Sequence, residues 1–179
     1  SYPDFGDVKG SFMPWDLDSF LFTEAKQDEF IDPDINRSEF SSNTLTRYSR
    51  ESQEEQLRQM NQAVLSTYVL EPERFAETKA LVHGWYGSTD VDVLVLPENN
   101  FDGDYVLPGW VGHEEVYYGG FAQYCRACHL QGFGTERFGE FEKFEKVQDK
   151  IQELVYTEGL MPLARLTADR FWVNYRGNK

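Results

Sequence analysis

Basic residues, long apolar runs and cysteines are all scarce in this sequence, and each shortage excludes a class of protein. The 179 residues include 17 Lys and Arg against 31 Asp and Glu, which gives a formal charge of −14. Phosphate backbones and anionic lipids repel such an acidic chain, so we expect neither nucleic acid nor a membrane surface as a partner. No apolar run approaches the ~20 residues of a membrane-spanning helix. Two cysteines are too few for a four-cysteine zinc site.

The apolar content and the distribution of charge indicate how the chain is organised. Hydrophobic residues make up 40% of the chain and aromatic residues 16%, which is enough for a packed core. Residues 1–110 hold 21 acidic and 8 basic side chains, whereas residues 111–179 hold 10 and 9. Both cysteines lie in the second part. We therefore predict an acidic N-terminal extension over 1–109 and a C-terminal domain over 110–179.

The N-terminal extension combines loop-like and helical segments. Residues 1–48 are rich in Asp, Ser and Pro and keep no regular period, which predicts loop with one short helix near 23–30. Apolar residues recur at helical spacing over 51–86, and Pro72 divides this stretch, so we expect a helical hairpin there. Residues 91–96, Val-Asp-Val-Leu-Val-Leu, are the one strand candidate. The predicted fold class is mainly α.

Two acidic turns resemble calcium-binding loops only in part. Asp32, Asp34 and Asn36 occupy the first ligand positions of an EF-hand loop. However, Arg37 stands at the glycine position, and the bidentate glutamate of the loop is missing. A shorter Asp-Gly-Asp pattern covers residues 102–104. We interpret both segments as solvated acidic turns, so calcium is not predicted.

The motif that indicates chemistry is Cys125-Arg126-Ala127-Cys128-His129. C-x-x-C-H is the attachment signature of c-type haem, because two thiols three residues apart on a helical turn reach both vinyl groups of one porphyrin edge. The adjacent histidine then becomes the proximal iron ligand. A thioredoxin-like pair would need a surrounding βαβ pattern, and a disulfide inside one helical turn has unsuitable geometry. Zinc would need an irregular set of histidines. The sequence therefore predicts one covalently attached haem c.

The elements around this motif follow a familiar order: an amphipathic helix over 114–124, C-x-x-C-H, a helix over about 140–157, Met161-Pro162 and a closing helix over 167–175. This order resembles a compact class I cytochrome c over residues 110–179. Phe121 stands four residues before the first cysteine, where the family places an aromatic residue. The resemblance implies that fold for the C-terminal part, preceded by a long, loop-rich, partly helical extension.

The resemblance also implies a set of haem-binding residues. Met161 is the expected distal ligand, since His/Met ligation is the familiar choice for electron-transfer haem. His83 and His113 are alternatives, and a second histidine in place of methionine would lower the reduction potential. Other cofactor-binding candidates are the apolar Phe121, Leu160, Pro162 and Trp172 and, near the haem propionates, the cations Arg126 and Arg165. A solvent-facing position is the alternative for both cations.

The leading functional hypothesis is a monohaem c-type cytochrome that carries single electrons between protein redox partners and is not an enzyme. The acidic charge predicts partners with basic docking surfaces. The resemblance implies assembly outside the cytoplasm, so we expect a secreted periplasmic or extracellular protein, mature after signal removal. Three alternatives remain: a subunit of a homopolymeric cytochrome filament with the N-terminal region as assembly arm, an accessory subunit of a larger oxidoreductase, and a haem enzyme or gas-binding protein with an open distal site.

Overall fold

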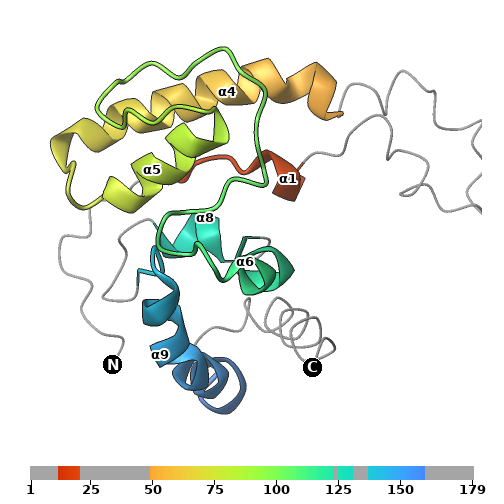
Figure 1. The fold of residues 1–179 in the computed structure, drawn as a ribbon, viewed down its shortest axis with the longest axis vertical. Coiled ribbons are helices and arrows are strands. Elements are labelled where there is room, and N and C mark those ends of the chain that lie inside the picture. The colour runs from red at the N-terminus through yellow and green to blue at the C-terminus, as the bar shows by residue number, and fades with distance from the viewer. Residues whose placement is uncertain (1–11, 21–48, 123–124, 131–136, 160–179) are drawn as a thin grey trace, which may run out of the picture.

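A computed structural model describes residues 12–20, 49–122, 125–130 and 137–159, and this part of the chain is mainly helical (Figure 1). Its elements are α1 (Leu17–Phe20), α4 (Arg50–Thr67), the 3₁₀ turn η2 (Tyr68–Leu70), α5 (Ala76–Trp85), α6 (Glu114–Val116), the π-helical turn η3 (Tyr117–Phe121), α8 (Arg126–His129), α9 (Phe141–Gln152) and the π-helical turn η4 (Glu153–Thr157). The expected helices near 23–30 and 167–175 lie outside the described residues. Within the described part, none of the helices combines the length and apolar character that a bilayer span requires.

The helical hairpin predicted over 51–86 is confirmed by α4 and α5, which lie side by side in Figure 1. Ser49 caps α4, because its side-chain oxygen accepts a hydrogen bond from the backbone N–H of Ser52 at 3.4 Å. Gly87 follows the end of α5 with a φ of +69°, a conformation that favours glycine. A serine side chain and a glycine turn thus bound the two ends of the hairpin.

The hydrophobic core is one continuous cluster that draws on both sides of residue 109. From α5 it takes Leu81, Val82 and Trp85, all with 0% of their surface exposed. From the later part of the chain it takes Trp110, whose ring stacks on Phe121 at a centroid distance of 4.3 Å. The Trp110 indole N–H donates to the Phe138 carbonyl at 2.7 Å, so the one polar group of this large ring is satisfied. The proposed domain boundary itself stays a prediction.

The strand predicted over 91–96 is wrong, and no strand occurs among the described residues. Val93, Leu94 and Val95 are 42%, 42% and 69% exposed, whereas Leu96 is 1% exposed. The Leu96 N–H donates to the side chain of Gln62 at 2.5 Å, and its carbonyl accepts from Arg58. Side chains of α4 therefore pair with both backbone groups of Leu96, in the place of a partner strand.

The helices predicted on either side of the C-x-x-C-H motif are confirmed over the described residues; residues 123–124 of the first one lie outside them. Residues 114–122 are helical as α6, η3 and Ala122, and residues 141–157 as α9 and η4. Phe144 and Val155 are buried on one face of the second stretch, and Phe141, Val147 and Ile151 pack partly buried against the core. In Figure 1 the hairpin and α9 lie at opposite ends of the described structure, with α6 and α8 between them.

Candidate haem-attachment site

The C-x-x-C-H motif forms a single helical turn. The backbone N–H of His129 donates to the carbonyl of Cys125 at 2.9 Å, which is the bond of one α-helical turn. Helical register places residues 125, 128 and 129 on one side of this turn. Cys125 and His129 are both half-buried. Two cysteines and one histidine on the same side of one turn are the donor set of haem c, so these residues fit the predicted group.

The His129 ring leans on an aromatic cluster. It stacks on Phe138 with a centroid distance of 4.5 Å and an interplanar angle of 22°. The Phe138 N–H donates to the His129 carbonyl at 3.3 Å, which fixes the two residues to each other through the backbone as well. Phe138 in turn contacts Phe121 and Phe144, at ring distances of 6.4 and 5.7 Å. Phe121, expected in the haem wall, therefore joins the site through Phe138.

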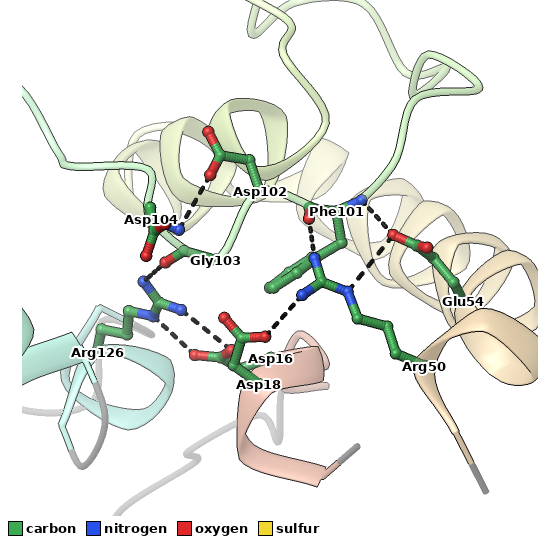
Figure 2. Close-up of polar contacts among 9 residues, drawn as sticks. All are labelled: Asp16, Asp18, Arg50, Glu54, Phe101, Asp102, Gly103, Asp104 and Arg126. Atoms are coloured by element: carbon green, nitrogen blue, oxygen red, sulfur yellow. Dashed lines mark hydrogen bonds and ion pairs between the residues drawn. The ribbon is translucent and has the colours of Figure 1, made fainter. Parts of the chain in front are cut away.

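Arg126, the residue after the first cysteine, lies in a buried ion pair. Its Nε and Nη2 donate to the two carboxylate oxygens of Asp16 at 2.7 and 3.1 Å, and both side chains are only 2% exposed (Figure 2). Its Nη1 donates to the Gly103 carbonyl at 2.9 Å, and the guanidinium lies 5.2 Å from the centre of the Trp85 ring. The solvent-facing alternative for Arg126 is therefore wrong.

Burial and pairing shift the pKa of Arg126 in opposite directions. Burial lowers the pKa of the guanidinium, but the hydrogen bonds and the charge of Asp16 outweigh burial and hold this pKa above its usual value. The guanidinium of Arg126 is therefore charged. Asp16 is not among the site residues expected from the sequence, because nothing local marks one aspartate among many as the partner of a residue 110 positions away.

A second arginine lies on the other side of α1. Arg50 pairs with Asp18 at 3.1 Å and also donates to the Phe101 carbonyl, while the Phe101 N–H donates to Glu54 (Figure 2). Gly103 lies close to this second pair. A Cβ at this glycine would fall 1.5 Å from a carboxylate oxygen of Asp18. Burial raises the pKa of Asp18 above its usual value even though Arg50 lowers it.

The two alternative histidine ligands occupy different surroundings. His83 is 1% exposed, and neither ring nitrogen has a hydrogen-bond partner among the described residues. Burial lowers the pKa of His83, and the charge of Lys79 lowers it further. Thr78, which donates to the Leu130 carbonyl at 2.5 Å, and Trp85, which covers Arg126, mark the side of α5 next to the motif. Helical register puts His83 on the side away from both.

His113 precedes α6 and is exposed, with its ring stacked on Phe141 at 3.7 Å. The stacking keeps this imidazole at the surface, against α9. The remaining site candidates and the first acidic turn lie outside the described residues. The candidates are Leu160, Met161, Pro162, Arg165 and Trp172, and the turn contains Asp32, Asp34 and Asn36. Their roles stay predictions.

The Asp-Gly-Asp segment is a tight turn, in which a carboxylate oxygen of Asp102 accepts from the Asp104 N–H at 3.0 Å. Among the described residues no three His, Cys, Asp or Glu side chains come together in a way that would hold a metal ion. The groups that approach Gly103 of this turn are Arg126, which donates to its carbonyl, and the carboxylate of Asp18 (Figure 2).

Comparison of the chain with protein-family models, with curated proteins and with solved structures gave no match. A function can therefore be inferred only from the chain's own residues and their geometry.

Proposed function

We propose that this protein is a monohaem c-type cytochrome that carries single electrons between protein redox partners outside the cytoplasm. The proposal depends on one observation: the C-x-x-C-H motif is a single helical turn closed by the 2.9 Å bond from His129 to Cys125. Cys125 and Cys128 would hold the haem through thioether bonds, and His129 would be the proximal ligand. When bound, the haem supplies an iron that gains and loses one electron.

The surroundings of His129 suit a ligand that must keep one orientation. Phe138 stacks on its ring, and Phe121 and Phe144 hold Phe138 in place. Groups that fix the orientation of a metal-bound histidine tune the metal as well as hold it. The buried rings also keep water from this side of the site, which favours electron transfer over reactions with solvent.

Two further elements of the proposal come from the resemblance to class I cytochromes c. Met161 would be the distal ligand, and the chain beyond residue 159 would complete the haem pocket. With a formal charge of −14 over the whole chain, partners with basic docking surfaces should associate faster at low ionic strength.

The first experiment tests covalent haem attachment. The full chain is produced in cells that mature c-type cytochromes, and the haem that survives denaturation is measured per chain. We expect one haem per chain, and none in the Cys125→Ser/Cys128→Ser double variant. A wild-type chain without covalent haem, produced beside a c-type cytochrome that does acquire it, would overturn the proposal.

The second experiment separates an electron carrier from an open haem site. We expect a low-spin absorption spectrum with a methionine-to-iron charge-transfer band, indifferent to carbon monoxide, and loss of the band in Met161→Ala. A low-spin spectrum without that band in the wild type would point to His83 or His113. High-spin iron that binds carbon monoxide would contradict electron transfer as the main role.

A further inference from the structure

We infer that Asp16 is a positioning residue for the haem-attachment turn: through Arg126 it fixes how that turn is held and sets the charge beside it. The effect on the reduction potential rests on the proposed function. The contact between Asp16 and the turn does not. It assigns a role in the haem site to a residue of the N-terminal extension, outside the part that resembles a cytochrome.

Arg126 stands inside the motif itself. It lies between the two cysteines, so its backbone belongs to the turn that would hold the porphyrin edge. Its side chain meets Asp16 in a two-pronged contact at 2.7 and 3.1 Å, the geometry that gives arginine–carboxylate pairs their directional preference. Rotation of the turn about its own axis would break both bonds at once.

The rest of the Arg126 guanidinium is also engaged. The Gly103 carbonyl accepts from its third nitrogen at 2.9 Å, and the Trp85 ring lies on its face. Tyr117 is close enough for the charge of Arg126 to lower the pKa of its hydroxyl, although burial raises that pKa more strongly. Arg126 thus has contacts on its edges and on its face, which leaves one arrangement for the side chain.

Asp16 is itself held in place by its neighbour Trp15. The buried side chain of Asn61 on α4 accepts from the Trp15 N–H at 2.6 Å and donates to the Trp15 carbonyl at 2.9 Å. The same amide donates to the Tyr86 hydroxyl at 3.1 Å. A chain of contacts therefore runs from the helical hairpin through Asn61, Trp15 and Asp16 to the haem-attachment turn.

The charge of the pair gives the redox consequence. Asp16 and Arg126 together carry no net charge, whereas Arg126 alone would leave a buried positive charge in the turn that would hold the haem. Such a charge favours the reduced iron, which has one positive charge fewer than the oxidised iron. Removal of the Asp16 charge should therefore raise the reduction potential, and removal of both charges should restore it.

The test is a redox titration of the haem-loaded full chain. In Asp16→Asn we expect about a tenfold higher ratio of reduced to oxidised haem at the same applied potential, equal to ~59 mV for one electron. The matched control is Asp18→Asn, which removes the same charge two residues away, from a half-exposed carboxylate paired with Arg50, and should shift the ratio far less. The double variant Asp16→Asn/Arg126→Gln should return close to the wild type.

Three outcomes would overturn the inference: equal shifts in Asp16→Asn and Asp18→Asn, no shift in a folded Asp16→Asn, or a double variant no closer to the wild type than Asp16→Asn. If Asp16→Asn fails to fold, a folded double variant with a wild-type potential supports the inference, and a double variant that also fails overturns it.

Failure of the proposed function gives a different result. A wild-type chain without covalent haem would exclude the expected effect on the reduction potential. The contact between Asp16 and Arg126 is then measured by denaturant unfolding. The cycle of Asp16→Asn, Arg126→Gln and their double variant should show strong coupling between the two side chains. Additive effects would show that the contact does not hold the turn.

Discussion

Two aspartate–arginine pairs flank α1, and they are built from the same parts (Figure 2). In each, the arginine pairs with an aspartate of residues 16–18, donates to a backbone carbonyl of residues 101–103 and lies 5.2 Å from the centre of an aromatic ring. They differ in burial. The side chains of Arg126 and Asp16 are both 2% exposed, whereas those of Arg50 and Asp18 are 21% and 45% exposed.

This difference in burial should decide how much stability is lost when one partner of each pair is removed. An ion pair that reaches water adds little stability, because solvent screens both charges and the free side chains are well solvated. In a buried pair, by contrast, loss of one partner leaves an uncompensated charge in the core. The same change in the two pairs should therefore cost different amounts of stability, and the following variants test that difference.

The largest effect is expected for Arg126→Met. It leaves the Asp16 carboxylate buried without its partner, so unfolding free energy should fall by about 3–5 kcal/mol. Urea unfolding of variant and wild type in the same haem state measures it. A loss below ~1 kcal/mol would show that the buried pair behaves like a surface pair.

The control for that variant is Asp16→Leu/Arg126→Met, which replaces both charges by apolar side chains. It should recover most of the loss, since apolar replacement of a whole buried pair is often neutral or stabilising. No recovery would indicate that the single variant acts through lost packing and not through an unpaired charge.

Gly103→Ala should have the next largest effect. Its new Cβ would displace the Asp18 carboxylate from Arg50 or shift the carbonyl that Arg126 binds, so we expect a loss of about 1–2 kcal/mol. The matched control is Gly119→Ala, where a Cβ would have no heavy atom of the described residues within 4 Å. A helical glycine in open space should tolerate alanine or gain from it. Equal losses in thermal or urea unfolding would contradict the close approach at Gly103.

A smaller effect is expected for Arg50→Gln. Its partner Asp18 is nearly half exposed and stays solvated after the change, so the loss of stability should be about 1 kcal/mol or less. Urea unfolding at low and high salt measures it, and the difference from the wild type should shrink with salt. A loss of stability as large as that of Arg126→Met would contradict the expected difference between the two pairs.

The smallest effect at neutral pH is expected for Asp18→Asn. Burial raises the pKa of Asp18, so the folded state binds this proton more tightly than the unfolded chain. The contribution of Asp18 to stability is thus fully present below its ordinary pKa and is lost as the pH rises through its folded pKa. The amide of the variant does not titrate, so the wild type should lose stability relative to the variant as the pH rises across the acid range. Unfolding at several acid pH values and at pH 7 tests the sign, and the opposite trend would contradict it.

Helices α4, α5 and α9 could be predicted from the sequence because their signals are local. Apolar residues repeat at the helical period, Ser49 caps the start of α4, and Gly87 ends the hairpin. The C-x-x-C-H motif is equally local, since Cys125 to His129 occupy one turn. In contrast, residues 91–96 have the apolar pattern of a strand but do not form one. The prediction failed because a pattern of side chains does not reveal whether a partner strand exists.

By itself, then, the sequence determined the helical class of the described residues, the hairpin and the helical turn of the C-x-x-C-H motif, each from residues within a few positions of one another. Only the tertiary structure decided that Asp16, and not another of the 31 acidic residues, meets Arg126. It also decided that Arg126 points into the protein. The physical reason is distance along the chain: a contact between residues 110 positions apart depends on how α1, α4, α5 and α8 pack together, and no local pattern specifies that packing.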